Sequence, residues 1–394
     1  MNNEGATPSQ RILSVDLIRG AVMILMAIDH VRVYAAIPAG GPSPDIFFTR
    51  WITHFCAPAF LFLAGTSAFF YGRRHSDLSR FLITRGLWLV ILELTVIRFG
   101  WTFNFDYGNY SLGGVIWVIG WSMVILSGLV KLPAHVVGVI GIIIMAGHNL
   151  LQWLQPAIGP SLGNDLKSIL WKFTYIYSSP ITVGADGPPI FVLYTLVPWV
   201  GIMAAGYGFG RFLLLGPARR NRLCLTIGLG AIGLFLVLRG FNIYGNPTIW
   251  NPPDGDWVVG LLSFLNVAKY PASLQFILMT LGPVVALIPC LERAKGRVAD
   301  WIALFGRVPF FFYIVHIPLI HVLAMGISLL NLGEISPWLF ANHPLVPPPP
   351  PEGYAWSLPA LYAVWALTIV MLYFACLWYA DMKSRRSDWW LKYI

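Results

Sequence analysis

The chain has 394 residues, of which 57% are hydrophobic and only 11% are charged, and its mean hydropathy is +0.69. This composition excludes an ordinary water-soluble globular domain and predicts an integral membrane protein. The net charge of +9 does not indicate a nucleic-acid partner, because Lys and Arg concentrate in alternate loops between apolar runs. We therefore expect no nucleic acid among its partners, and we expect contact with membrane lipid.

Runs of about 20 apolar residues predict an all-α fold, a polytopic transmembrane helix bundle of about ten spans. The count becomes eleven if the segment 257–266 is a re-entrant or interfacial helix. The predicted spans are 13–38, 46–71, 80–99, 113–131, 133–152, 190–213, 221–240, 270–290, 308–330 and 358–380. The expected domain organisation is a cytoplasmic tail at 1–10, one transmembrane domain at 11–382 and a basic cytoplasmic tail at 383–394.

Clusters of Lys and Arg follow the second, sixth and eighth predicted spans and close the chain, so both termini are expected in the cytoplasm. Three long connections on the opposite side, 153–188, 241–269 and 331–357, are rich in Gly, Pro, Asn and Trp. They are expected either to cap a cavity or to form ordinary exposed loops. The four cysteines lie in or beside predicted spans without a CxxC pair, so neither a disulfide nor a metal site is expected.

The first predicted span is unusual because it carries five polar groups. They are Asp16, Arg19, Asp29, His30 and Arg32. Arg19 and His30 are eleven positions apart, so on a helix they lie within roughly 20° of each other and about 16 Å apart along the axis. Asp16 lies close to the same face. Ionisable groups in such a line predict the wall of a polar path or site inside the membrane.

His30 is the leading candidate for a catalytic base, because an imidazole can take a proton from a hydroxyl or an amine near neutral pH. The alternative is a structural hydrogen bond. Asp29 lies on a face about 100° away, so it is a second catalytic candidate but is equally expected to meet Arg32 or a neighbouring helix. Arg19 can pair with Asp16, bind an anion such as a nucleotide phosphate, or do both.

Other candidates lie in later spans. His54 precedes Pro58, which removes the helical hydrogen bond to the carbonyl of His54, and could face the same cavity as His30. His316, two residues before Pro318, is a weaker third candidate. His321 is 140° away from His316 on a helix, which makes the two a poor metal pair, and no metal is expected.

Four stretches resemble one family of membrane enzymes. They are SVDLIRGAVMILMAIDHVR from Ser14, RWITHFCAPAFLFLAG from Arg50, NVAKYPASLQFILMTLGP from Asn266 and FGRVPFFFYIVHIPLIH from Phe305. Together they resemble the heparan-alpha-glucosaminide N-acetyltransferase catalytic-domain family, particularly its bacterial members. More distantly, the spacing of Arg19 and His30 is similar to a signature of the membrane O-acyltransferase family.

The resemblance implies an acetyl or acyltransferase that moves an acetyl group from cytoplasmic acetyl-CoA to a sugar-type acceptor, through an amino or hydroxyl group, on the outer side of the membrane. It implies that His30 is the catalytic histidine and that Arg19 assists binding of acetyl-CoA. From their positions in the sequence, Asp29 and His54 are further catalytic candidates and Asp16 a further candidate for acetyl-CoA binding. His316, Lys269 and Tyr270 are expected to bind the acceptor.

The same resemblance places the chain in the bacterial cytoplasmic (inner) membrane, and a homodimer is allowed. One departure from the animal enzymes is that no histidine lies between Arg32 and Thr53, so a shared role for His30 and His54 stays open. The alternatives are a transporter or exporter of a lipid or small anionic solute, and a membrane protein without catalysis that presents its outer loops to a partner.

Overall fold

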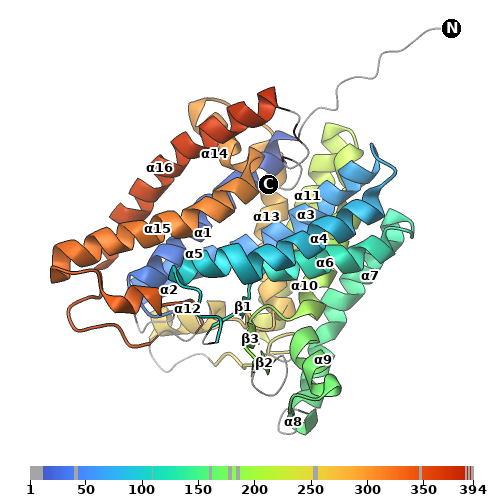
Figure 1. Ribbon diagram of the computed structural model, residues 1–394. Coiled ribbons are helices and arrows are strands. Elements are labelled where there is room, and N and C mark those ends of the chain that lie inside the picture. Colours follow the sequence, from blue (N-terminus) through green and yellow to red (C-terminus); the bar gives the residue numbers. More distant parts are fainter. Residues whose placement is uncertain are drawn as a thin grey trace.

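The computed structural model describes residues 12–39, 43–108, 110–158, 162–175, 180–182, 187–251, 256–345, 348–386, 388 and 391. The described chain is a bundle of long helices with a very small sheet at one end (Figure 1). The all-α fold class predicted from the sequence is therefore confirmed. The predicted tail at 1–10 lies outside the described residues.

The elements follow the chain in this order: α1 Leu13–Tyr34, α2 Pro44–Trp51, η1 Ile52–Phe55, α3 Cys56–Gly72, α4 Leu78–Leu92, the π-helical turn η2 Glu93–Ile97, α5 Arg98–Thr102, β1 Leu112–Gly113, α6 Val115–Leu129, α7 Ala134–Gly147, η3 His148–Leu154, α8 Gln155–Ile158, α9 Leu166–Thr174, β2 Ile181–Thr182, β3 Pro189–Val192, α10 Leu196–Phe209, η5 Phe212–Leu214, α11 Pro217–Gly240, α12 Trp257–Leu265, α13 Leu274–Leu291, α14 Arg297–Arg307, α15 Pro309–Leu332, η6 Pro337–Phe340 and α16 Leu358–Arg385.

Every predicted span contains a helix, and two differences have physical reasons. The sixth begins late, at Leu196, because Pro189–Val192 pairs as β3 with β1 and β2 in the order β1-β3-β2. The helix α14 was not predicted, because its eleven residues are too few and too polar on one face to be recognised as a span. The segment 257–266 does form a helix, α12.

Seven helices in the described part of the chain are long and apolar enough to cross a membrane. They are Pro44–Gly72, Ala134–Leu154, Leu196–Leu214, Pro217–Gly240, Leu274–Leu291, Pro309–Leu332 and Leu358–Arg385. The remaining predicted spans are also helical, but α6 is short and both α1 and the continuous α4-η2-α5 helix carry several charges. The predicted number of about ten spans is therefore not confirmed.

The helix α1 lies inside the bundle and contacts α3, α13, α14, α15 and α16. Its closest approach is to α14, where two glycines remove the side chains between the backbones. A Cβ atom on Gly20 would lie 1.9 Å from the Ile302 carbonyl oxygen, and one on Gly306 would lie 1.9 Å from that of Asp16. This packing fixes α14 against the first third of α1.

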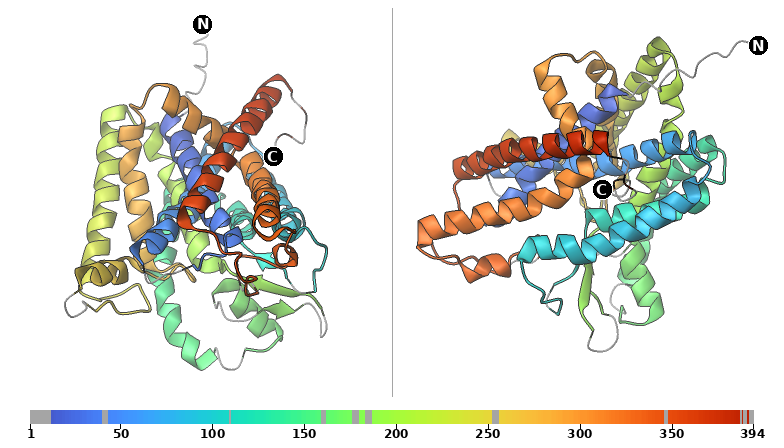
Figure 2. Two further views of the ribbon diagram at one scale, coloured as in Figure 1. Left: turned by 90° about the vertical axis from the view of Figure 1, so that its left-hand side faces the viewer. Right: turned by 45° about the horizontal axis from the view of Figure 1, so that its top comes forward.

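The long connections gather with the sheet at the end of the bundle opposite the N-terminal end of α1 (Figure 2). Two buried arginines bind backbone carbonyl groups at this end, one in the loop between α5 and β1 and one in the connection between α11 and α13. Arg98 donates to the carbonyl oxygen of Tyr110 at 3.0 Å, and Arg239 donates to those of Phe264 and Thr248 at 3.0 and 2.8 Å. These guanidinium groups pair with backbone carbonyls that have no partner within a helix or sheet, so the described parts of these two connections are held against the bundle.

Candidate functional site

Two ionisable side chains from different spans, α1 and α15, lie in direct contact. The Nδ1 atom of His30 lies 2.6 Å from the Nε2 atom of His316. The ring centroids are 4.8 Å apart and the ring planes differ by only 24°. The distance between the ring centroids is longer than the N···N distance by about two ring radii. The two nitrogens therefore lie on the line between the rings, and the imidazoles meet edge to edge in nearly one plane, as a hydrogen bond requires.

The partners of His316 determine which nitrogen of His30 carries the proton. The Nδ1 atom of His316 lies 2.7 Å from the carbonyl oxygen of Tyr313, which only accepts, so Nδ1 of His316 is the donor. In a neutral His316 ring the Nε2 atom then carries a lone pair and accepts from the Nδ1–H of His30. The second nitrogen of His30, Nε2, is left with its lone pair and can accept a proton.

Asp29 does not bind the imidazole of His30. Its Oδ1 atom accepts from the Nε atom of Arg32 at 2.8 Å, the i,i+3 contact expected from the sequence as one alternative. Arg32 also donates to the carbonyl oxygen of Ile37 at 2.6 Å, so the end of α1 is tied to the chain that follows it. The Asp29 side chain remains 23% exposed beside His30, so it can accept a hydrogen bond from a bound molecule.

Lys269 and Tyr270 lie next to this centre. The ammonium group of Lys269 lies 5.3 Å from the centre of the Tyr270 ring and 6.0 Å from that of Tyr194, and its charge acts on both Asp29 and His30. Within the described chain, Lys269 forms no ion pair or hydrogen bond through its ammonium group. The structure thus places Lys269 and Tyr270, both predicted from the sequence to bind the acceptor, near His30. It also adds Tyr194 to this group.

His54 lies in the short 3₁₀ turn η1 between α2 and α3, one turn before Pro58, so the predicted loosening of this helix is present. The side chain is only 6% exposed, and its ring packs edge-on against Phe276 with centroids 5.5 Å apart. Neither ring nitrogen has a hydrogen-bond partner among the residues that the structure describes. His54 therefore does not join the His30–His316 pair, although the charge of Lys269 reaches it.

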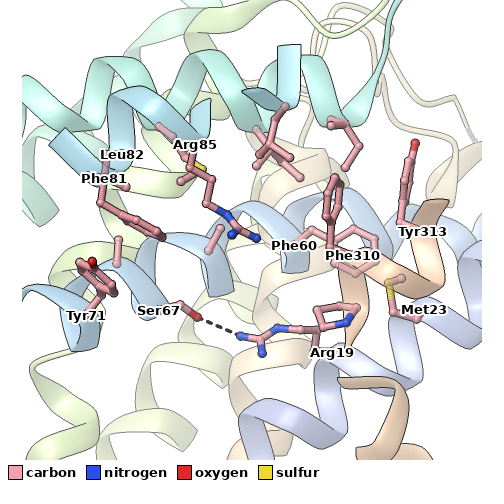
Figure 3. A pocket seen from close by; sticks show the side chains of 17 residues that line it. Arg19, Met23, Phe60, Ser67, Tyr71, Phe81, Leu82, Arg85, Phe310 and Tyr313 are labelled. Atoms are coloured by element: carbon pink, nitrogen blue, oxygen red, sulfur yellow. Dashed lines mark hydrogen bonds between the residues drawn. The ribbon is translucent and has the colours of Figure 1, made fainter. Parts of the chain in front are cut away.

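A cavity of about 330 Å³ opens between α1, α3, α4, α6 and α15. Figure 3 shows Tyr71 and Tyr313 at its opposite ends, with the guanidinium groups of Arg19 and Arg85 entering from opposite walls. Most of the remaining lining is apolar, for example Met23. The cavity thus combines a cationic part with a long apolar part that leads into the bundle.

Arg19 is held in this cavity by neutral partners more closely than by its acidic neighbour. It donates to the Ser67 hydroxyl oxygen at 2.9 Å and to the Gly306 carbonyl oxygen at 3.2 Å, whereas Asp16 Oδ1 lies 3.6 Å away. Its side chain is 18% exposed, compared with 7% for Asp16. The arginine is oriented by α3 and α14 and can still interact with an anion in the cavity.

Tyr313 connects the cavity with the histidine pair. It lines the inner end of the cavity, its ring centroid lies 6.4 Å from that of His30, and its carbonyl oxygen binds His316. Sequence reasoning did not select Tyr313 or Arg85 as site residues. The only available signal for Tyr313 was its position one helical turn before His316, and Arg85 looked like one of several topogenic charges.

His321 belongs to a different environment from His316, as their spacing predicted. It stacks on Phe103 with ring centroids 4.1 Å apart and contacts the ring of Tyr34 at 4.9 Å. Among the residues that the structure describes, no group of three or more His, Cys, Asp or Glu side chains is arranged to hold a metal ion.

Comparison with known protein families identifies the family of this chain. Residues 11–241 match the family described as heparan-alpha-glucosaminide N-acetyltransferase, catalytic. The chain belongs to this family. It is thus an acetyltransferase-type membrane protein, and the resemblance seen in the sequence is confirmed. No curated protein matches the chain.

The match to the heparan-alpha-glucosaminide N-acetyltransferase family ends at residue 241, within one residue of the C-terminus of α11. Arg19, His30 and the wall of the cavity formed by α3, α4 and α6 lie inside the matched segment. Lys269 and His316 lie beyond it. The geometry around these two residues therefore comes from the structure alone.

Proposed function

We propose that this protein transfers an acetyl group from acetyl-CoA, bound from the cytoplasmic side, to a sugar-type acceptor on the opposite side of the membrane. The observation that carries the proposal is the cavity that extends from Tyr71 past Arg19 and Arg85 to Tyr313, whose ring lies edge-on to that of His30. It brings a cationic site to within one side chain, that of Tyr313, of a histidine with a lone pair available for proton transfer.

The shape and chemistry of the cavity suit the donor. Two guanidinium groups at the entrance match the phosphates of CoA, because arginine binds phosphate through charge-assisted hydrogen bonds. The apolar lining beyond them, including Met23 and Phe310, accommodates the pantetheine arm. About 16 Å separates Arg19 from His30 along α1, close to the reach of an extended pantetheine arm.

The acceptor is expected beside Asp29, His30 and Lys269. All three retain some exposed surface, yet none of them lines the cavity under Arg19. The acceptor is therefore proposed to approach His30 from outside this cavity and to meet the thioester beside Tyr313. Lys269 and Tyr270 would hold the acceptor and Asp29 would orient its reacting group.

In the reaction the acceptor hydroxyl or amine attacks the thioester carbonyl carbon and loses its proton to Nε2 of His30. The bond from carbon to sulfur breaks as the new bond from carbon to oxygen or nitrogen forms. The proton then passes from His30 to the thiolate of CoA, which leaves as the thiol. His316 holds the Nδ1 proton of His30 throughout, so that Nε2 faces the reaction.

Purified protein in lipid nanodiscs, supplied with acetyl-labelled CoA and a panel of sugars and amino sugars, tests the proposal. We expect saturable CoA binding and label transfer to at least one acceptor. Absence of both would refute it. Flux of an anionic solute through proteoliposomes without any dependence on CoA would instead support a transporter.

A further inference from the structure

A second recess lies on the outer surface of the bundle, between α14 and α16. Figure 1 shows these two helices side by side, and they are in contact. The recess has a volume of about 630 Å³ and shares no residue with the cavity that contains Arg19. Its lining residues are Arg297, Val298, Asp300, Trp301, Leu304, Arg307, Tyr373 and Leu377.

The two walls of the recess differ in chemistry. The α14 wall carries two exposed guanidinium groups, Arg297 and Arg307, at its two ends. Within the described residues neither forms an ion pair or a hydrogen bond through its side chain. The α16 wall is apolar, and Leu377 is 47% exposed on a helix long and apolar enough to cross a membrane. The recess is therefore cationic at its rim and open to lipid along α16.

Aromatic rings mark the depth at which the recess lies. Trp301 packs against Tyr373 with ring centroids 5.9 Å apart, at the floor of the recess. Trp and Tyr concentrate where the hydrocarbon of a membrane meets the polar headgroups. The basic end of α16, with Lys383 and Arg385, lies about three helical turns beyond Tyr373. The aromatic pair and the nearby basic helix end favour a position of the recess near the headgroups on the basic side of the protein.

We infer that the recess is a binding site for an anionic glycerophospholipid, whose phosphate lies between Arg297 and Arg307 and whose acyl chain follows Leu377 along α16. Arg297, Asp300 and Arg307 together carry one net positive charge, which complements a headgroup with a single negative charge such as phosphatidylglycerol. The carboxylate of Asp300 can accept hydrogen bonds from the glycerol hydroxyl groups of that lipid. A zwitterionic headgroup would leave the excess charge uncompensated.

Such a lipid would act on the donor cavity through α14. Gly306 precedes Arg307, and the Gly306 carbonyl oxygen is one of the partners that hold Arg19. The close backbone contact at Gly20 and Gly306 transmits any displacement of α14 directly to α1. A lipid that fixes α14 therefore also fixes the guanidinium group proposed to bind the donor. The lipid site itself does not depend on the proposed function.

The test uses delipidated full-length protein titrated with phosphatidylglycerol or phosphatidylcholine, with bound lipid counted by native mass spectrometry and Tm recorded. We expect phosphatidylglycerol to bind and raise Tm. The double variant Arg297→Gln, Arg307→Gln should bind it about 10-fold more weakly or worse. The control variant Arg219→Gln, Arg222→Gln loses the same charge at the exposed start of α11 and should bind it normally.

A second variant, Leu377→Trp, fills the recess without changing charge and should also weaken binding while circular dichroism stays normal. Equal binding of phosphatidylcholine, or unchanged binding by both recess variants, would overturn the inference. Displacement of the lipid by glycerol 1-phosphate alone at similar concentration would also overturn it, because the site would then recognise free phosphate and not a lipid.

Discussion

The two ends of α1 carry the same local pattern, an aspartate followed three residues later by an arginine, but the structure uses them in opposite ways. At the first end Arg19 is 18% exposed in the cavity between α1, α3, α4, α6 and α15, and Asp16 is 7% exposed. At the second end Arg32 is 8% exposed and Asp29 is 23% exposed beside His30. One end thus presents a cation and the other a carboxylate next to a base.

Neighbouring helices cause this reversal. Arg19 is drawn away from Asp16, 3.6 Å distant, by the Ser67 hydroxyl and the Gly306 carbonyl. Arg32 keeps its 2.8 Å contact with Asp29. An identical pair in sequence can therefore be a ligand-binding arginine or a fixed ion pair, and the surrounding helices decide which. If the two ends do separate functions, donor binding and catalysis, variants should affect different kinetic constants.

The largest effect is expected at the second end. His30→Ala removes the proposed base, so kcat should fall by about 10²- to 10⁴-fold while CoA binding persists. Transfer assays and equilibrium CoA binding on the same preparation measure the two quantities. His135→Ala changes an exposed histidine at the start of α7 and should leave both unaltered. Full activity of His30→Ala would contradict the proposal that the His30 end of α1 carries out catalysis.

The next effect tests how His30 is positioned. His316→Phe keeps a ring but cannot accept the Nδ1–H of His30, so kcat should fall by about 10²-fold and the pH profile of kcat should shift. The KM for acetyl-CoA should stay constant. His316→Gln retains an acceptor and should recover part of the activity, which a role in packing alone would not explain. Equal activity of the Phe and Gln variants would contradict the positioning role.

At the first end the expected change is in KM. Arg19→Met should raise the KM for acetyl-CoA about 10- to 100-fold with little change in kcat, because one charge-assisted contact to phosphate is lost. Arg385→Met, which removes an exposed arginine that pairs with Asp381 on the same helix, is the matched control. A fall in kcat without a change in KM would place Arg19 in the chemical step.

The smallest effect concerns one of the long connections near the second end of α1. His343 in the 333–357 connection stacks on Tyr110 with centroids 4.0 Å apart, and burial, assisted by the charge of Arg98, lowers its pKa to about 4. Since the unfolded pKa is about 6.5, the unfolded chain binds the proton more readily between these values. Stability should therefore fall as the pH drops from about 6.5 towards 4.

His343→Phe keeps the stacked ring and removes the titration. Thermal unfolding measured across this pH range should show a smaller loss of Tm in the variant than in the wild type. The same slope in both proteins would show that protonation of His343 does not affect stability.

The sequence by itself determined the features that depend on local geometry. Apolar runs located the long helices, because about 20 consecutive apolar residues are needed to cross a membrane. The spacing of Asp29 and Arg32 predicted their contact, since residues three apart are neighbours on any helix. The resemblance of the segment around Arg19 and His30 also identified the family that the comparison then confirmed.

The tertiary structure decided what joins distant parts of the chain. His316 meets His30 across 286 residues, while His54, much closer in sequence, does not. Helical spacing cannot rank such partners, because the choice depends on how α15 and η1 pack against α1. The donor cavity needs five helices at once, and α14 is held by backbone contacts at two glycines that carry no sequence signal of their own. Local hydrogen bonding therefore fixed the helices, and side-chain packing between them built the site.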